Sequence, residues 1–436
     1  MEVEGAVPAA AGRSATGPPR IVREGVWIGL GQAGAVLAGL VGIRLLTGFV
    51  PPAVYGEVVL LLGIVALGTN LFCGPFQQAL LRYYPQARDA ARVGALRRLA
   101  GRSLIAAAAL LAGVLLAAGA LRSTIAPFAA VAALVAVDTW RTFESGLLNG
   151  ERRQRDYMVR TSLDAWARWL GAAGLAWLLG ATALHVLAGM LLGSGLVNLL
   201  LWRRIVRGEP VEGAGEAWMA AWRGPFLRYA LPLVPLAALN WILSMGDRYV
   251  LAAWWSTATA GVYVAAYGLA SQPFIALNAI IHSTLRPVLY DAVARGDALK
   301  ERRTLRVWVS VVAGAMGLGW IALAVLAHPI CALLLGSRYQ GAAALVPIIA
   351  GAYALQAVQQ AFEIMLYAHG KTQRLVALQV VAAGASALLY FLLIPRYAGL
   401  GAALATVGAF VVTTLVACFL AGAPARLRGA PGELLE

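Results

Sequence analysis

Long apolar stretches recur along the whole chain, and only short polar connections separate them. About twelve of these stretches reach the roughly 20 residues that a helix needs to cross the hydrocarbon core of a bilayer. Backbone N–H and C=O groups within a bilayer must be bonded inside the protein, so such stretches fold as helices. The pattern predicts an all-α integral membrane protein with about twelve transmembrane helices. The predicted spans are residues 25–49, 54–77, 102–121, 124–149, 160–180, 182–202, 226–247, 254–283, 306–327, 341–368, 374–395 and 399–421.

Basic residues orient these predicted spans. When the spans are threaded alternately through a membrane, 28 of the 35 Lys and Arg residues fall on the side that holds both termini. Basic residues near span ends are retained in the cytoplasm, so both termini are predicted to be cytosolic. The exceptions to the pattern are Arg44, Arg122, Arg141, Arg168, Arg248, Arg338 and Arg396.

Composition excludes several classes of protein. With 61% hydrophobic and 13% charged residues, the chain has no connection long enough for a separate soluble domain. The net charge of +15 is explained by basic residues beside lipid head groups, so nucleic acid is not an expected partner. The three cysteines and four histidines are scattered along the chain. The sequence therefore indicates no disulfide framework, no metal site and no cofactor, and no catalytic motif that would make the protein an enzyme.

The longest cytosolic connection divides the chain into two sets of six spans. Phe143-Glu144 near the end of span four recurs as Phe362-Glu363 near the end of span ten, which is typical of an internal repeat. We expect two pseudo-symmetric six-helix bundles related by an axis along the membrane normal. The predicted organisation is a disordered cytosolic tail (1–24), an N-terminal bundle (25–202), a linker with a short interfacial helix (203–225), a C-terminal bundle (226–421) and a cytosolic tail (422–436).

Charged residues inside two neighbouring spans form the main candidate site. Asp138 and Arg141 share one face of span four, with Glu144 at its edge, and Asp164 and Arg168 form an i,i+4 pair in span five. Counting from the turn between the spans, the two arginines should lie at similar depth. One interpretation is a hydrated pocket in which both guanidiniums engage an anionic head group. The other is a buried salt-bridge lock between helices.

Further polar residues lie inside other predicted spans. Such residues turn inward, away from lipid, so we expect a lined cavity, although hydrogen bonding between helices would also explain each stripe alone. The cavity candidates are Gln356, Gln360 and Glu363 in span ten, with Gln359 alongside, and Gln272, Asn278 and His282 in span eight. The gating or interfacial candidates are Arg44, Asp247 and Arg248 near the outer ends, and Pro232 and Pro235, which permit a bend.

Seven short segments carry a resemblance to a known family. They follow one another along nearly the whole chain at a spacing that fits twelve spans. The segments are Arg44-Leu45-Leu46-Thr47 through Pro51 to Tyr55-Gly56, Leu81-Arg82-Tyr83-Tyr84-Pro85, Tyr229 to Leu233, Gly246 to Leu251, Ala260 to Tyr263, Gly336 to Tyr339, and Gly399 to Ala403. In these segments the chain resembles the polysaccharide-transporter branch of the multidrug/oligosaccharidyl-lipid/polysaccharide (MOP) flippase superfamily, which includes the O-antigen flippases.

The resemblance implies a MATE-like V of two bundles that opens alternately to either side of the bacterial inner membrane. It implies a flippase that moves a polyprenyl-diphosphate-linked oligosaccharide outward for surface polysaccharide assembly, with membrane lipids and polysaccharide assembly proteins as further partners. It also implies a cationic cleft, a role for which we assign Arg141 and Arg168. Span one carries Gln32 and no acid, unlike some drug-and-cation antiporters of the superfamily.

Two other functions stay open at this point. A MATE-type exporter of small organic cations would need acid-dominated pockets, whereas the candidate cluster is mixed in charge. A membrane glycan ligase or polymerase would need a sizeable outer loop to handle sugars, whereas the outer connections are all short. A lipid-linked glycan flippase is therefore the favoured interpretation.

Overall fold

The computed structural model describes residues 18–89, 92–121, 125–151, 153–205 and 216–422, and no strand occurs among them. The prediction of an all-α protein is confirmed. The helices are α1 (Pro18–Phe49), α2 (Pro52–Asp89), α3 (Val93–Leu121), α4 (Ile125–Gly150), α5 (Gln154–Leu179), α6 (Ala183–Ile205), α7 (Glu216–Ala230), the 3₁₀ turn η1 (Leu231–Leu233), α8 (Val234–Trp254), α9 (Thr257–Ala294), α10 (Ala298–Leu334), the 3₁₀ helix η2 (Ser337–Ala344), α11 (Val346–Ala368) and α12 (Thr372–Leu420).

Most of these helices can cross a membrane. Within the described residues, nine helices are long and apolar enough, and η2 with α11, bent by 52°, makes a tenth span. Helix α5 does not reach the same hydropathy, because it carries charges in its middle, but its 26 residues are long enough to cross. The protein is therefore a multi-pass membrane protein.

Helix α12 is two spans rather than one. Its 49 residues would measure roughly 74 Å at 1.5 Å per residue, more than twice the hydrocarbon thickness. The chain reverses at Ala398, whose φ of 50° lies in the left-handed region. Just after the turn, a Cβ at Gly401 would lie 2.2 Å from the Leu393 carbonyl oxygen, so only glycine permits this close return. With α5 and both parts of α12 included, the described helices supply the twelve predicted spans.

The predicted N-terminal tail is corrected in part. Helix α1 begins at Pro18, a favourable first residue of a helix, so the prediction of disorder is wrong for residues 18–24. The N-terminal tail prediction for residues 1–17, the linker segment 206–215 and the C-terminal tail 423–436 lie outside the described residues.

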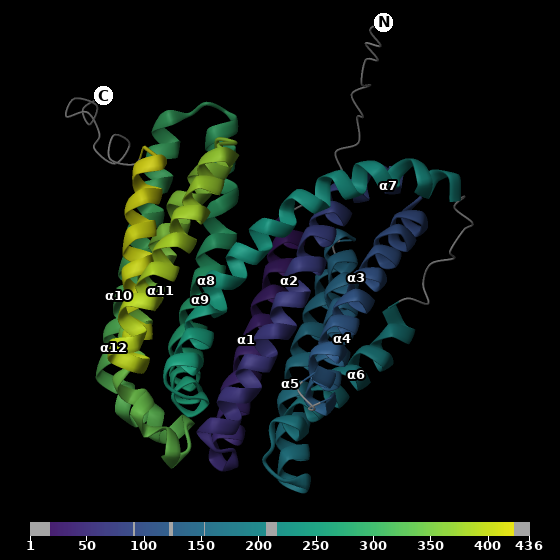
Figure 1. Ribbon diagram of the computed structural model, residues 1–436. Helices are drawn as coiled ribbons and strands as arrows, with labels where there is room; N and C mark the ends of the chain where they lie inside the picture. The colour runs from purple at the N-terminus through teal and green to yellow at the C-terminus, as the bar shows by residue number, and fades with distance from the viewer. Residues whose placement is uncertain (1–17, 90–91, 122–124, 152, 206–215, 423–436) are drawn as a thin grey trace, which may run out of the picture.

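Helix α7 supplies the helix expected in the linker, but it is longer than predicted and continues through η1 into α8. Trp218 and Trp222 stack with ring centroids 5.1 Å apart. Met219 and Phe226 are buried against residues of α2 and α3. Figure 1 shows α7 lying across one end of the molecule, at an angle to the spans. Pro232 lies in η1, where the chain turns from α7 into the membrane.

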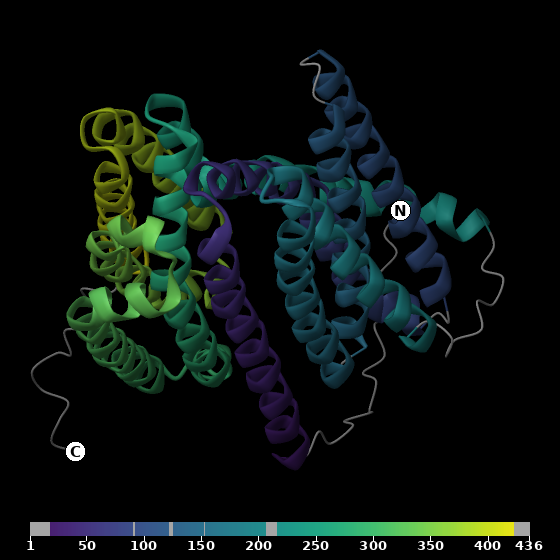
Figure 2. The ribbon, with the colours of Figure 1, turned by 90° about the horizontal axis from the view of Figure 1, so that it is seen from below.

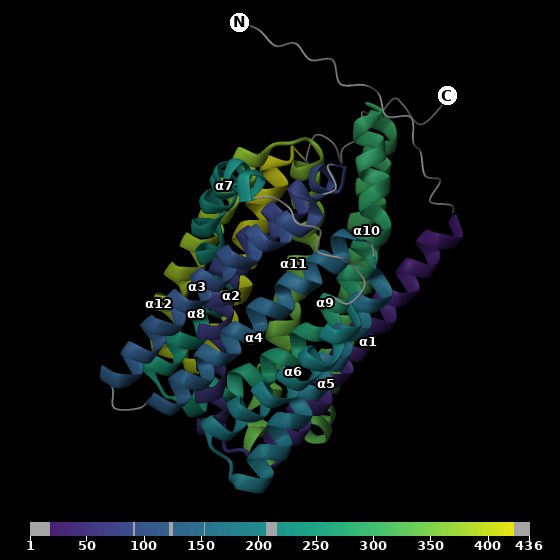
Figure 3. The same ribbon diagram turned by 90° about the vertical axis from the view of Figure 1, so that its right-hand side faces the viewer.

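The spans fall into two groups in space. Figure 1 shows α8–α12 on one side and α1–α6 on the other, and the view from the end opposite α7 shows the same separation (Figure 2). Within the first group α12 packs on α8 and α11, and within the second α5 packs on α1 and α6. Between the groups, α2 packs on α8 and α9. Seen from the side, the spans run along one another, with α1 and α10 along one edge (Figure 3).

The two groups meet closely at the end opposite α7, in a contact that we name the outer seam. A Cβ at Gly56 would lie 1.9 Å from the Thr257 carbonyl oxygen, and a Cβ at Gly261 would lie 2.1 Å from that of Pro52. The contact is reciprocal, because each added Cβ would also lie 3.0 Å from the other glycine's nitrogen. The backbones of α2 and α9 therefore touch there.

Hydrogen bonds extend the outer seam from α1 to η2. Gly336 N donates to Thr47 Oγ1 at 3.1 Å, and Tyr339 Oη donates to the Val50 carbonyl oxygen at 2.9 Å. Both Thr47 and Tyr339 are buried. The outer seam thus joins α1 and α2 to α9 and η2 through backbone contacts and buried hydrogen bonds.

Candidate functional site

The predicted arginines of α4 and α5 share two carboxylates. Arg141 Nε lies 3.3 Å from Asp138 Oδ1 and 3.5 Å from Asp164 Oδ2. Arg168 Nε lies 3.5 Å from Asp164 Oδ2, and its Nη2 donates to Asp138 Oδ1. The i,i+3 spacing on α4 and the i,i+4 spacing on α5 turn all four side chains toward the same place. We name these four residues the arginine cluster.

Polar side chains of helix α6 form hydrogen bonds with this cluster. Ser194 Oγ donates to Asp164 Oδ1 at 2.5 Å, and Asn198 Nδ2 donates to the same oxygen at 3.2 Å. Arg160 Nε and Nη2 donate to Asn198 Oδ1 at 3.1 and 2.5 Å. Arg160 was expected among the cytosolic basic residues, but it is buried, because α5 begins at Gln154 and residue 160 is already well inside the helix.

Glu144 does not join the arginine cluster. It accepts two hydrogen bonds from Arg97 Nη2 of α3, at 2.8 and 3.0 Å. The sequence analysis grouped Glu144 with Asp138 and Arg141 in one candidate site, and this grouping is corrected by its bonds to α3. The bonded network holds three carboxylates, those of Asp138, Glu144 and Asp164, and four arginines, of which Arg97, Arg141 and Arg168 bond to the acids directly and Arg160 is linked through Asn198. The region as a whole keeps an excess of positive charge.

The two central arginines are neither sealed inside the protein nor fully exposed. The side chain of Arg141 is 26% exposed and that of Arg168 is 20% exposed, whereas the side chain of Asp164 is only 5% exposed. Among the described residues, no hydrogen bond reaches the terminal nitrogens of Arg141, and its contacts with Asp138 and Asp164 are made by Nε. The acids therefore hold the arginines in place while guanidinium N–H groups remain available for an anion.

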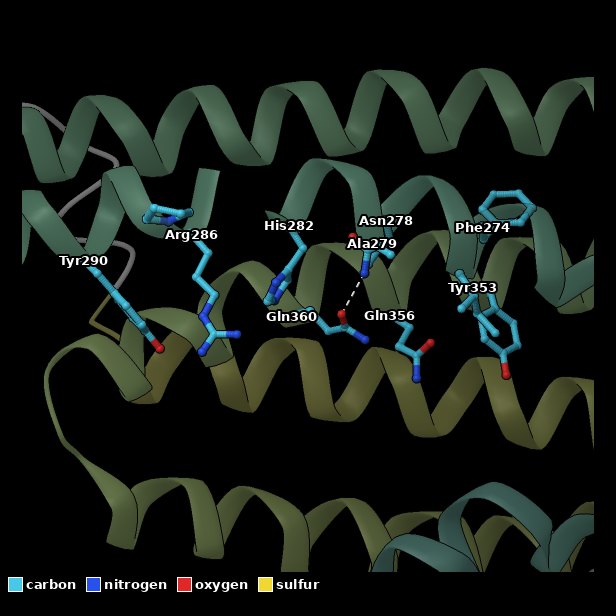
Figure 4. Close-up of a pocket in the computed structure, with 12 residues that line it drawn as sticks. Phe274, Asn278, Ala279, His282, Arg286, Tyr290, Tyr353, Gln356 and Gln360 are labelled. Carbon is cyan, nitrogen blue, oxygen red and sulfur yellow. Dashed lines mark hydrogen bonds between the residues drawn. The ribbon is translucent and has the colours of Figure 1, made fainter. Parts of the chain in front are cut away.

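A second polar region lies between α9 and α11. A cavity of about 660 Å³ opens there, and Figure 4 shows its side chains gathered between the two helices. The predicted residues Gln356 and Gln360 line it, and Asn278 Nδ2 donates to Gln360 Oε1 at 2.7 Å. The full lining is Phe274, Ile275, Asn278, Ala279, His282, Arg286, Pro287, Tyr290, Tyr353, Gln356, Ala357 and Gln360.

A smaller cavity of about 250 Å³ adjoins it on the other side of α11. Tyr353, Gln356 and Gln360 line both cavities. Glu363 lines only the smaller one and accepts a hydrogen bond from Gln359 Nε2 at 2.9 Å. Gln359 Oε1 accepts in turn from Thr413 Oγ1 of α12 at 2.8 Å. Neither cavity is lined by Arg141 or Arg168, so the predicted cavity residues occupy two separate regions.

The outer candidates Asp247 and Arg248 are buried rather than interfacial. Asp247 is 2% exposed and accepts from the Tyr263 hydroxyl at 2.6 Å. Arg248 is 6% exposed, lies 4.6 Å over the ring of Tyr267 and donates to the Ser244 carbonyl oxygen at 3.0 Å. The reason is that α8 at this level is covered by α9 and α12.

The remaining gating candidates differ in position. Arg44 is exposed near the end of α1, as expected of an interfacial residue. Pro235 lies at the start of α8, directly after η1. No group of three or more His, Cys, Asp or Glu side chains in the described part of the chain could hold a metal ion.

Several polar residues of the two regions escaped the sequence interpretation. Arg97 and Arg160 looked like topological charges, because both lie near connections. Ser194 and Asn198 carried a signal that could have found them, since their i,i+4 spacing in an apolar span marks a polar face. Arg286 and Tyr290 of α9 lie about one and two turns beyond His282, past the predicted end of span eight, and no pattern pointed to them.

The comparisons with known proteins agree with this architecture. An inward-facing multidrug resistance MATE family transporter of the MOP superfamily superposes with a TM-score of 0.68 at 14% identity, covering 90% of this chain and 94% of that one. The lipid II flippase MurJ in an inward closed conformation gives 0.69 at 13% identity, covering 91% and 87%. A MOP superfamily transporter from Pyrococcus furiosus gives 0.60 at 15% identity, covering 94% and 96%. The predicted MOP/MATE-like fold is therefore confirmed.

The comparisons by sequence match a shorter part of the chain than the comparisons by structure. No protein of curated function is similar enough in sequence to match. The family described as polysaccharide biosynthesis protein matches residues 21–293, which is more than half of the chain and includes both α4 and α5. The chain has the fold of the MOP superfamily and belongs to the polysaccharide biosynthesis protein family.

Proposed function

We propose that this protein is a flippase that carries a polyprenyl-diphosphate-linked oligosaccharide from the cytosolic to the outer face of the bacterial inner membrane. The observation that carries the proposal is the arginine cluster. Charged groups inside a membrane are rare without a task, because each costs about 2.5 to 3.5 kcal/mol on insertion scales. Here two guanidiniums are partly exposed and held by buried acids, an arrangement suited to a diphosphate.

The membership of a polysaccharide biosynthesis family supports a lipid-linked glycan as the cargo. The excess of arginine over acid around α4 and α5 disfavours a small organic cation, since like charges repel. A ligase or polymerase stays the main alternative of another class, and the experiment below separates it.

Alternating access is supported by the difference between the two ends of the molecule. The outer seam closes one end through Gly56 and Gly261. Arg286 and Tyr290 of the larger cavity lie near the opposite end of α9. On this basis we propose that the structure is inward-facing, with both termini cytosolic, and that transport requires the outer seam to separate.

The test replaces both arginines by lysine. Arg141→Lys with Arg168→Lys keeps the charges that balance Asp138 and Asp164, so the fold should survive, but it loses the planar fork that binds phosphate. We expect surface polysaccharide export to fall by roughly 10-fold to 100-fold, as for the loss of charge-assisted hydrogen bonds of about 1.5 to 3 kcal/mol. Lipid-linked glycan should accumulate on the cytosolic face.

The matched control is Arg303→Lys with Arg306→Lys, which makes the same change at exposed positions of α10 and should leave export unchanged. Deletion of the gene completes the test. Build-up of lipid-linked glycan on the outer face of deleted cells would indicate a ligase or polymerase instead. Normal export by the lysine double variant, at normal protein abundance, would refute the role of the arginine cluster.

A further inference from the structure

We infer that the cavity between α9 and α11 is a subsite for the sugar part of the cargo, separate from the arginine cluster that takes its diphosphate. This inference rests on the proposed function and deepens it. The volume of about 660 Å³ lies within the range of roughly 300 to 1,000 Å³ that small-molecule sites occupy.

Apart from Arg286 at one end and His282, the lining is uncharged and has the chemistry of a site for polyols. Side-chain amides come from both helices, with Asn278 on α9 and Gln356 and Gln360 on α11. An amide offers both a donor and an acceptor, and sugar hydroxyl groups need both. No carboxylate lines this cavity among the described residues. The site therefore favours uncharged hydroxyl-rich groups over organic cations.

One acceptor in the cavity has no partner. Asn278 is only 8% exposed, and its Nδ2 donates to Gln360, but its Oδ1 makes no hydrogen bond with any described residue. A buried acceptor left unpaired costs about 1 to 3 kcal/mol. A hydroxyl group of a bound sugar would satisfy it. Gln356 likewise forms no hydrogen bond with the described residues and stands in the same cavity (Figure 4).

Aromatic rings close both ends of the row of amides. Tyr353 and Phe274 stand at one end and Tyr290 at the other, as Figure 4 shows. Aromatic faces suit the apolar C–H faces of sugar rings, while a tyrosine hydroxyl can also bond. Arg286, which lines the same end, lies 5.3 Å over the Tyr290 ring. The row of amides thus ends in aromatic side chains on both sides, a combination that suits a sugar.

The experiment measures equilibrium binding of two lipids to the purified full-length protein. One is undecaprenyl diphosphate, which has no sugar, and the other is the lipid-linked oligosaccharide extracted from cells that lack this gene. The variant is Asn278→Leu with Gln360→Leu, which keeps side-chain size and removes both partners of one hydrogen bond, so little stability should be lost. Gln356→Leu is a second variant, which breaks no hydrogen bond among the described residues.

The control is Gln379→Leu, which lies in the wall of the smaller cavity only. We expect the wild type to bind the glycolipid at least tenfold more tightly than undecaprenyl diphosphate. Both cavity variants should lose most of that difference while their affinity for undecaprenyl diphosphate stays unchanged. The lysine variant of the arginine cluster should bind both lipids more weakly.

Two results would overturn the sugar subsite alone: equal wild-type affinity for the two lipids, or an undiminished preference in both cavity variants. A wild type that binds neither lipid would overturn the proposed function, and the subsite with it.

Discussion

The two halves of the molecule place different chemistry at similar positions. Counting back three residues from Glu144, which follows Phe143 near the end of α4, leads to Arg141. Counting back three from Glu363, which follows Phe362 near the end of α11, leads to Gln360. In the first half the inward face is charged and joined by ion pairs, and in the second it is lined by amides. The two regions therefore differ in the chemistry of their side chains.

The difference has a physical consequence for how each half is held together. A charge inside the membrane must be balanced, and in the arginine cluster Asp138 and Asp164 balance the two arginines. The hydroxyl of Ser194 and the amide of Asn198 donate hydrogen bonds to Asp164. Amides need no counter-charge, so Gln356 and Gln360 can stand at a cavity wall without one. In the proposed function, the charged half takes the anionic diphosphate and the amide half takes neutral groups.

The largest effect is expected when the first half is made chemically like the second. Asp138→Asn, Arg141→Gln, Asp164→Asn and Arg168→Gln together remove two acids and two bases, so no buried charge of the cluster is left unpaired. If the four residues were only a salt-bridge lock, amide bonds would replace it and transport would persist. We expect transport to fall about 100-fold or more, with normal abundance in the membrane. Glycan export and protein level in the same cells provide the measurement.

The next effect concerns the contact that joins the halves. A Cβ at Gly261 would lie 2.1 Å from the Pro52 carbonyl oxygen, so Gly261→Val should force the outer seam apart. Overpacking costs about 1 to 3 kcal/mol, which would raise the open population roughly 5-fold to 100-fold. The measurement is labelling of Val50→Cys by a membrane-impermeant thiol reagent, after replacement of the three native cysteines.

Gly314→Val is the control for this change, since a Cβ there meets nothing within 4 Å. Labelling at residue 50 should then stay at the wild-type rate. An equal labelling rate in the Gly261 variant would mean that the outer seam is not the barrier on that side.

A smaller effect should distinguish the two glutamates. Glu144→Gln removes the charge that Arg97 bonds twice, and it should destabilise the protein by about 1 to 3 kcal/mol, toward the lower figure because Arg97 is partly exposed. Glu363→Gln removes no ion pair among the described residues, because the partner of Glu363 is the amide of Gln359. It should change stability by less than about 1 kcal/mol. Thermal unfolding of both purified variants makes the comparison, and equal losses would contradict it.

The smallest effect tests the neutral bonds of the second half. Thr413→Val removes the hydroxyl that bonds to Gln359, at an expected cost of about 0.5 to 1.5 kcal/mol and with transport unchanged. Thr414→Val is the control, because its hydroxyl bonds only to the Phe410 carbonyl oxygen within its own helix. The difference in unfolding temperature between the two variants isolates the link between α11 and α12.

The fold could be predicted largely from the sequence, because apolar length is a direct requirement of the bilayer. The wrong predictions concern helix bounds that depend on contacts between helices or on the position of the helix end. Helix α7 continues into span seven, and its residues Met219 and Phe226 are buried against α2 and α3. No local sequence pattern predicts this packing. The end of α9 was set too early at residue 283, since its last turns carry Arg286 and Asp291, and polar residues are tolerated at the end of a membrane-spanning helix.

The candidate site could be predicted in part. Helical spacing brought Asp138 and Arg141, and Asp164 and Arg168, onto faces that do meet, because i,i+3 and i,i+4 neighbours always share a face. Partners from a third helix could not be predicted that way. Arg97 takes Glu144 away from the cluster because α3 packs on α4, and Asp247 is buried because α9 and α12 cover α8.

The central claim is that Arg141 and Arg168 bind the diphosphate of the cargo. Its most direct test is the dissociation constant for undecaprenyl diphosphate, measured for the purified wild type and for the Arg141→Lys, Arg168→Lys variant. The account predicts roughly 10-fold to 100-fold weaker binding by the variant, with the Arg303→Lys, Arg306→Lys control equal to wild type. Equal affinity in all three proteins would contradict it.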